Sequence, residues 1–113
     1  MKLSMEQAIF AQNIGKLIDF IYSKNYSCTL GDAYRTPEQA ALYAKQGKGI
    51  VDSLHCKRLA IDLNLFDTSL KYLPQGDDYR TFGEYWESLH PQNRWGGRFK
   101  TLVDSNHFEM KDE

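Results

Sequence analysis

Apolar residues near the start of the chain recur every three or four positions, the spacing of one face of an α-helix. The stripe consists of Met5, Ile9, Ile14, Leu17, Ile18 and Ile21. It predicts an amphipathic helix over residues 4–24 that packs this face on the core. Ser4, followed three residues later by Gln7, has the form of a capping box, so Ser4 is the predicted N-cap.

Two further helices are predicted from their boundary signals. Thr36 precedes Pro37, and proline is favoured at the first helical position. Gln39 completes a second capping box with Thr36. This helix should end before a glycine-containing loop over residues 45–54. An aromatic-rich segment predicts a third helix over residues 77–89, which a His-Pro pair ends.

Strict alternation of apolar and polar residues predicts two strands. Over residues 59–66 the apolar side chains share one face, and Asp62 lies on the polar face. Residues 107–111 alternate in the same way, with His107 and Glu109 on one face. If the two strands are neighbours, Asp62 and His107 can approach each other.

The whole pattern predicts an α+β fold, with helices packed on a small antiparallel sheet. A further short strand is expected over residues 27–30. The length of 113 residues fits one domain, 1–113, with one core. Hydrophobic residues make up 42% of the chain and aromatic residues 13%, enough for a packed interior. We expect this domain to be a monomer.

Charge and hydropathy exclude two classes of partner. The 14 basic and 15 acidic residues nearly balance, which argues against nucleic acid as a partner. No apolar run approaches the roughly 20 residues of a membrane span. Polar residues such as Glu6 interrupt the N-terminal stripe, so no secretory signal peptide is expected. We expect synthesis in the cytoplasm and export by another route.

The two cysteines, Cys28 and Cys56, are too few for a disulfide framework and lack the paired spacing of a structural zinc site. Free thiols are the simplest interpretation. A cysteine hydrolase remains an alternative, since either thiol could pair with a histidine that activates it.

Two of the three histidines each have an aspartate a few residues away along the chain, in a pattern typical of a metal centre. His55 precedes Asp62 by seven residues, and His107 follows Asp104 by three. Two imidazoles and one carboxylate are a ligand set for catalytic zinc, which keeps one coordination position open. We expect His55, Asp62 and His107 to hold Zn²⁺. The third histidine, His90, is expected to have a structural place at a helix end.

Asp104 is then free to act as the general base. Zinc lowers the pKa of water toward about 7, and Asp104 would take the proton and return it to the leaving amine. Arg35 is the candidate to hold an oxyanion or a substrate carboxylate, with a surface charge as the alternative. Glu109 shares a face with His107 and is expected to contact that ligand rather than the metal.

Taken in order, these motifs resemble the zinc D-alanyl-D-alanine carboxypeptidase and L-alanyl-D-glutamate endopeptidase family. These are the VanY-like enzymes and phage endolysins of the LAS metallopeptidases. The resemblance covers about residues 30–110. It rests on Ser53 with His55, Asp62-Leu63, Trp95-Gly96-Gly97, Asp104 with His107-Phe108-Glu109, and the upstream Tyr34-Arg35-Thr36 with Gln39.

The resemblance implies zinc on the two histidines and Asp62, with Asp104 as the catalytic carboxylate and Arg35 as an electrostatic helper. It implies the LAS or Hedgehog-like fold, with the zinc site in a groove across the sheet. From the matching motifs, Ser53, Gln39 and Trp95 are candidates to bind substrate, although a tryptophan is also a common core residue. The chain departs from the family at Arg58, where a glycine is usual. Arg58 either changes the path of the loop or enters the cleft.

The leading hypothesis is therefore a zinc peptidase that cleaves the L-alanyl-D-glutamate bond of the peptidoglycan stem peptide. The aspartate at the base position and the short chain resemble phage endolysins, which reach the cell wall through a membrane pore. The alternatives are a D-alanyl-D-alanine carboxypeptidase and a non-catalytic, zinc-stabilised wall-binding module.

Overall fold

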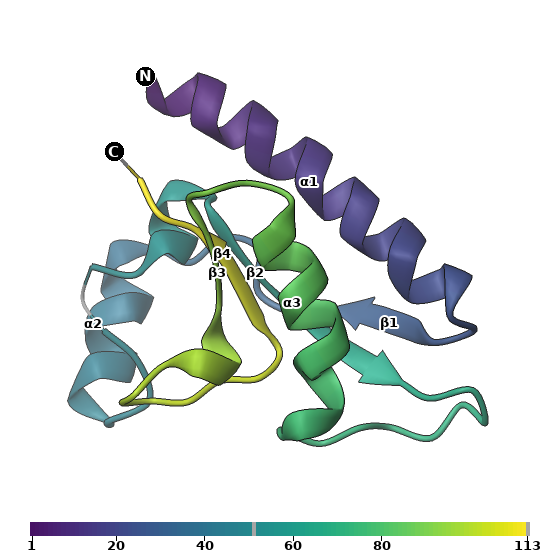
Figure 1. Cartoon of the computed structure of the whole chain (residues 1–113). Coiled ribbons are helices and arrows are strands. Elements are labelled where there is room, and N and C mark those ends of the chain that lie inside the picture. The colour runs from purple at the N-terminus through teal and green to yellow at the C-terminus, as the bar shows by residue number, and fades with distance from the viewer. Residues whose placement is uncertain (51, 113) are drawn as a thin grey trace.

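Four antiparallel strands form one sheet in this computed structural model, which describes residues 1–50 and 52–112. The order across the sheet is β1-β2-β4-β3. The strands are β1 (Ser27–Leu30), β2 (Ala60–Phe66), β3 (Asn93–Trp95) and β4 (His107–Met110). The α+β prediction with a small antiparallel sheet is thus confirmed (Figure 1).

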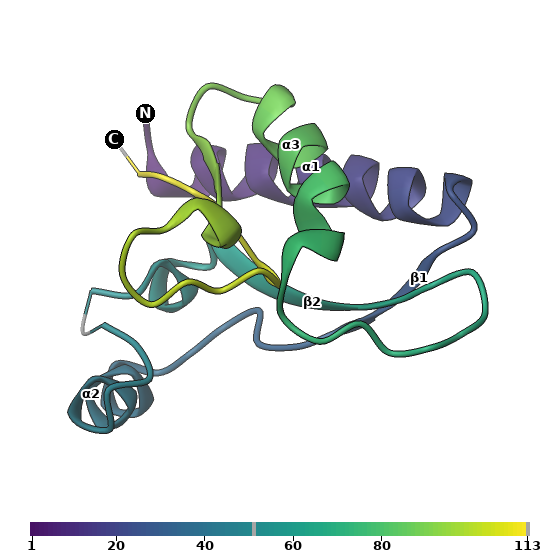
Figure 2. The same cartoon turned by 60° about the horizontal axis from the view of Figure 1, so that its bottom comes forward.

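Two helices cover one face of the sheet (Figure 2). The first, α1 (Leu3–Ser23), and the third, α3 (Arg80–Ser88), pack on each other and on the apolar side of the strands. The core side chains come from these helices and from β2, β3 and β4: Phe10, Leu17, Ile21, Leu63, Leu65, Phe82, Trp86, Trp95, Phe108 and Met110. The alternation in β2 works as predicted, because its apolar residues face the helices and Asp62 faces away.

The second helix, α2 (Pro37–Lys45), stands apart from α1 and α3, on the other side of the sheet (Figure 2). Ala40 is its one buried residue, so little apolar packing holds it. Thr36 caps it as predicted, since its Oγ1 accepts a hydrogen bond from the backbone N–H of Gln39 at 3.1 Å. The second helix is therefore a lightly packed element of the fold.

Three boundaries differ from the sequence-based expectation. Lys2, not Ser4, is the N-cap of α1, and it caps without a side-chain hydrogen bond. The expected loop over residues 45–54 ends in a 3-10 turn, Leu54–Lys57, and residue 51 lies outside the described residues. The third helix begins with a 3-10 turn, Asp77–Tyr79, before α3. Within the described part of the chain, no helix is long and apolar enough to cross a membrane.

Candidate metal centre

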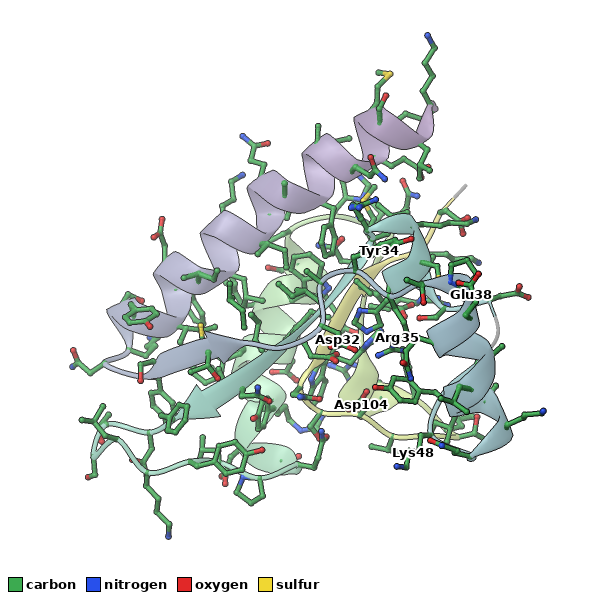
Figure 3. The ribbon with its side chains drawn as sticks, turned by 180° about the vertical axis from the view of Figure 1, so that it is seen from behind. Asp32, Tyr34, Arg35, Glu38, Lys48 and Asp104 are labelled. Atoms are coloured by element: carbon green, nitrogen blue, oxygen red, sulfur yellow. The ribbon has the colours of Figure 1, made fainter. Side chains whose placement is uncertain are left out.

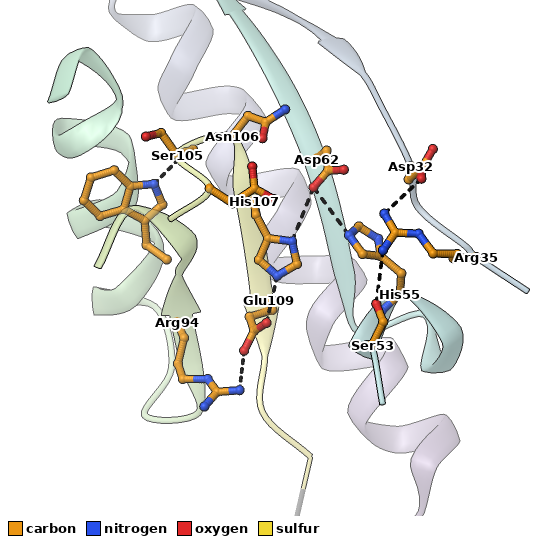
Figure 4. Close-up of polar contacts among 12 residues, drawn as sticks. Asp32, Arg35, Ser53, His55, Asp62, Arg94, Ser105, Asn106, His107 and Glu109 are labelled. Atoms are coloured by element: carbon orange, nitrogen blue, oxygen red, sulfur yellow. Dashed lines mark hydrogen bonds and ion pairs between the residues drawn. The ribbon is translucent and has the colours of Figure 1, made fainter. Parts of the chain in front are cut away.

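Three side chains from three segments converge on the polar face of the sheet (Figure 4). Asp62 on β2 and His107 on β4 are direct partners in the antiparallel register. His107 Nδ1 lies 3.3 Å from Asp62 Oδ1. His55, from the 3-10 turn before β2, places its Nε2 3.4 Å from the same oxygen. The structure therefore brings together the three residues that the sequence predicts as metal ligands.

The spacing of these three side chains fits a metal ion. One candidate ligand atom from each residue lies within 4.8 Å of the others. Tetrahedral zinc with bonds of about 2.0–2.2 Å separates its ligand atoms by roughly 3.4 Å. The separations of His107 Nδ1 and His55 Nε2 from Asp62 Oδ1, 3.3 and 3.4 Å, match that value. The donor set, two imidazoles and one carboxylate, is also one that zinc accepts.

Burial and charge act against each other in this cluster. Burial would raise the pKa of Asp62, but the hydrogen bonds and charges of His107 and His55 outweigh it and lower that pKa to about 2. Burial would lower the pKa of His107, but its bonds to Asp62 and Glu109 raise that pKa to about 9. Without a metal, the positive charge of protonated His107 therefore balances the charge of Asp62. A bound metal cation can replace that proton.

Ser53 and Arg58 shape the turn that presents His55. Ser53 caps the turn, because its Oγ accepts a hydrogen bond from the backbone N–H of His55 at 3.2 Å. Arg58 ends it in the left-handed region, at φ 55°. A glycine, which the resemblance leads us to expect at this position, would adopt this conformation without strain. The Arg58 guanidinium lies 4.1 Å from the centre of the Tyr34 ring and does not line the groove described below.

Asp104 lies in the turn that leads into β4. Its backbone N–H donates to the Gly96 carbonyl at 3.0 Å, and its own carbonyl accepts from the His107 N–H at 3.1 Å. Gln75 Nε2 donates to Asp104 Oδ1 at 3.0 Å. Burial, and next the charge of Asp62, raise the pKa of Asp104 above its ordinary value. The group is therefore a better proton acceptor than a solvated aspartate.

Gly96 allows this turn to approach the sheet closely. A Cβ at this position would lie 2.2 Å from the Asp104 carbonyl oxygen and 2.9 Å from His107 Cβ. The Trp-Gly-Gly motif thus positions Asp104 and His107 through backbone contact.

Trp95 is not a substrate residue, which corrects one expectation. Its side chain is 1% exposed, and its indole N–H donates to the Ser105 carbonyl at 2.7 Å. The ring packs against Gly83 of α3 and Gly97. A ligand cannot reach a side chain that is enclosed in this way, so Trp95 supports the Asp104 turn from within the core.

Arg35 reaches the site from the segment before α2. Its Nη2 atom donates a hydrogen bond to Asp32 Oδ2 at 3.0 Å, and its Nη1 atom lies 3.5 Å from Ser53 Oγ. Its guanidinium also lies 4.9 Å from the centre of the Tyr43 ring. These contacts fix the guanidinium in the wall of the site, beside Ser53 and His55 (Figure 4). Seen from behind, Arg35 lies between Asp32 and α2 (Figure 3).

A groove of about 750 Å³ runs past the cluster. Its walls contain His55 and His107 together with Asp104, Arg35 and Ser53. Gln39, by contrast, is not among the groove residues, so its expected role in substrate binding has no geometric support. Exposed apolar side chains form part of the rim: Ile50, Leu102 and Val103.

The sequence analysis missed several polar groove residues, among them Lys48, Gln75 and Arg94. Gln75 comes from a loop without periodicity, and its contact with Asp104 depends on tertiary folding. Arg94 lies on β3, opposite Glu109. The sequence could have predicted the pairing of Arg94 with Glu109 only through a strand over residues 93–95, and these residues show no clear strand pattern.

Neither cysteine forms the arrangement that a cysteine hydrolase needs. Both are free thiols, as expected. Cys28 lies on β1, where burial raises the pKa of its thiol, the opposite of what a nucleophile requires. Among the hydrogen bonds of the described residues, none joins a histidine to either sulfur.

Comparison with known families decides the assignment. The sequence model of the D-alanyl-D-alanine carboxypeptidase family matches residues 46–110, more than half of the chain. The chain belongs to this family. The match contains His55, Asp62, Asp104 and His107, so it covers the whole cluster. The resemblance stated from the motifs is thus confirmed, and the chain is a peptidase of a metal-dependent family that acts on peptidoglycan.

A solved structure supports the fold of this carboxypeptidase-family protein. It is the L-Ala D-Glu endopeptidase ChiX of Serratia marcescens, with a TM-score of 0.62 and 19% sequence identity. The alignment covers 75% of this chain and 67% of that chain. No curated protein matches the chain. The predicted LAS peptidase fold is therefore confirmed at the level of architecture.

Proposed function

We propose that this protein is a zinc peptidase that hydrolyses the L-alanyl-D-glutamate bond of peptidoglycan stem peptides. One observation carries the proposal. His55, Asp62 and His107 converge with the spacing of metal ligands, while Asp104 lines the same groove without joining them. A purely structural metal site has no use for a further carboxylate of raised pKa.

A bound zinc ion would supply a Lewis acid that polarises the scissile carbonyl and makes water more acidic. Asp104 accepts the proton of the attacking water and gives it to the departing amine. Gln75 holds one oxygen of this carboxylate. Arg35, fixed by Asp32 and Ser53, presents a positive charge to an oxyanion or to a substrate carboxylate.

A D-alanyl-D-alanine carboxypeptidase is the second candidate, because the matching family bears that description. The endopeptidase is preferred because the motifs resemble the endolysin branch and the similar solved structure, ChiX, is an L-Ala D-Glu endopeptidase. As an endolysin, the protein would meet the cell wall after release through a membrane pore.

Digestion of purified murein separates these candidates. The zinc-loaded protein is incubated with murein, and the products are identified by mass spectrometry. New alanine carboxyl termini paired with new glutamate amino termini support the endopeptidase. Released free D-alanine supports the carboxypeptidase instead. Intact murein, from a protein that holds zinc, would favour the non-catalytic wall-binding module.

A further inference from the structure

A chain of charged side chains extends behind His107, on the side away from Asp62 (Figure 4). His107 Nε2 lies 2.7 Å from Glu109 Oε1. The other oxygen of Glu109 forms an ion pair with the guanidinium of Arg94. His107 is therefore held at both ring nitrogens, by Asp62 at Nδ1 and by Glu109 at Nε2.

The sheet register builds this arrangement. Arg94 on β3 and Glu109 on β4 are direct cross-strand partners, and Glu109 follows His107 by two residues, on the same face. On the other side of β4, Glu109 faces Ala60 of β2, whose side chain is too short to reach it with a polar group. Within the described residues, Arg94 is the one cation that pairs with Glu109 apart from the imidazole itself.

Burial makes this pairing necessary. Glu109 is 6% exposed, and a buried carboxylate is costly unless it is paired. The Arg94 side chain is about half exposed, with a value of 48%, so it loses little hydration in the contact. From the edge of the groove, Arg94 can thus hold the Glu109 carboxylate in one orientation.

We propose that Arg94 is a positioning residue of the metal centre, which acts through Glu109 on His107. Glu109 accepts a hydrogen bond from Nε2–H and so leaves the lone pair of Nδ1 directed toward Asp62 and a shared cation. Arg94 holds Glu109 in register through the cross-strand ion pair. The inference rests on the proposed metal site and extends it to a third strand, β3.

Arg94 also lines the groove, so a direct contact with substrate is the competing role. The two roles differ in what they change. A positioning residue alters zinc affinity in the absence of substrate. A substrate-binding residue alters KM and leaves zinc affinity as it was.

A double-mutant cycle on zinc affinity separates the two roles. Zinc dissociation constants are measured by competition with a chromophoric chelator for the wild type, Arg94→Gln, Glu109→Gln and the double variant. Loss of an outer contact to a metal-bound histidine typically weakens metal binding by about 10–100-fold, which is the effect expected for Glu109→Gln. For Arg94→Gln we expect a loss of about 3–10-fold, a fraction of that range. The double variant should match Glu109→Gln alone, since Arg94 acts only through Glu109.

Arg80→Gln is the matched control. Arg80 has a similarly exposed side chain, at 45%, and forms an ion pair with Asp77 at 2.7 Å, away from the three ligands. The zinc affinity of Arg80→Gln should equal that of the wild type. Arg94→Lys, which keeps the charge, should recover part of the affinity that Arg94→Gln loses.

A spectroscopic readout tests the geometry directly. In the zinc-loaded wild type, long-range ¹H–¹⁵N correlation should show the proton of His107 on Nε2. Unchanged zinc affinity in Arg94→Gln, additive losses in the double variant, or a proton on Nδ1 would each overturn the inference. If the wild type binds no zinc, the proposed function itself fails, and this outcome is distinct from all three.

Discussion

At the scale of single residues, Asp104 is distinguished by what it does not contact. It lines the groove with His55 and His107, yet among the described residues its carboxylate accepts a hydrogen bond from Gln75 rather than from a member of the cluster. Its burial and the neighbouring charge of Asp62 raise its pKa. These are the properties of a group that exchanges a proton with water rather than binding a cation.

Replacement of Asp104 by Asn should therefore remove turnover and keep the metal. General acid–base catalysis typically contributes 10²–10⁴-fold, so we expect kcat to fall by about that factor. Steady-state hydrolysis of a stem peptide and zinc content per chain are the two measurements. Asp78→Asn, at an exposed position of a different turn, should leave both unchanged. Full activity of Asp104→Asn would reject the assigned role.

Arg58 gives a second prediction at this scale. Its positive φ costs most for a β-branched residue and least for glycine. Arg58→Gly loses the stacking on Tyr34, which is worth about 0.5–1 kcal/mol. It also relieves backbone strain of similar size. The free energy of unfolding of this variant should therefore stay close to that of the wild type. Arg58→Val should lose about 2 kcal/mol by adding strain to the lost contact. Urea denaturation compares the two variants, and equal stabilities would contradict this account of the turn.

At the scale of elements, the sequence predicted what periodicity controls. The helix α1 and the strands β2 and β4 form where periodicity predicts them, and the burial of β2 alternates as expected. In α1 the buried face includes Phe10, whereas Met5, which the predicted stripe placed on that face, is 54% exposed. In β4 all four residues are buried, so the face of His107 and Glu109 is enclosed as well. The 3-10 turn that presents His55 has no such signal. Its shape depends on the cap from Ser53 and on Arg58 in an uncommon conformation. The cap of α1 was mispredicted, since the helix begins before Ser4 and the hydroxyl has no terminal N–H to accept from.

The contact between α3 and β3 supports a prediction about two helix glycines. A Cβ on Gly83 would lie 2.1 Å from the Trp95 ring, whereas a Cβ on Gly15 of α1 would meet nothing within 4 Å. Gly83→Ala should lower the free energy of unfolding by about 1–3 kcal/mol through overpacking. Gly15→Ala should raise it by about 0.5–1 kcal/mol through helix propensity. Urea denaturation measures both, and a stable Gly83→Ala variant would show that Trp95 is not tightly enclosed.

At the scale of the whole molecule, the sequence predicted the four chemical groups and the grouping of three of them around one cation, but not the strand register that brings them together. His55, Asp62, Asp104 and His107 come from segments that only the β2–β4 register brings together. That register follows from long-range pairing, which local patterns do not encode. For the same reason Gln75 and Arg94 were missed, and Gln39 and Trp95 were assigned to substrate. Motif membership does not say which way a side chain faces, and the Trp95 side chain faces the core.

Because His107 binds a proton in the metal-free state, the stability of the protein and its zinc affinity should both depend on pH. In the metal-free state the pKa of His107 is raised from 6.5 to about 9, so its stabilising contribution is complete below pH 6.5 and is lost as pH rises through 9. Zinc requires the neutral imidazole, so at pH 7 zinc binding should release about one proton from His107. Zinc affinity should then rise by up to about tenfold per pH unit between pH 7 and 9. Calorimetry in two buffers of different ionisation enthalpy counts the proton, and pH-independent affinity would argue against a protonated His107.

The central claim is that one cation is shared by His55, Asp62 and His107. Metal content after zinc loading and desalting tests it most directly, by elemental analysis of the wild type, His55→Ala, His107→Ala and His90→Ala. His90 is the control, because its Nδ1 accepts a backbone hydrogen bond from Gln92 at the end of α3, outside the cluster. We expect about one zinc per chain in the wild type and His90→Ala, and close to none in the other two. Zinc retained in full by His55→Ala and His107→Ala, or absent from the wild type, would contradict the account.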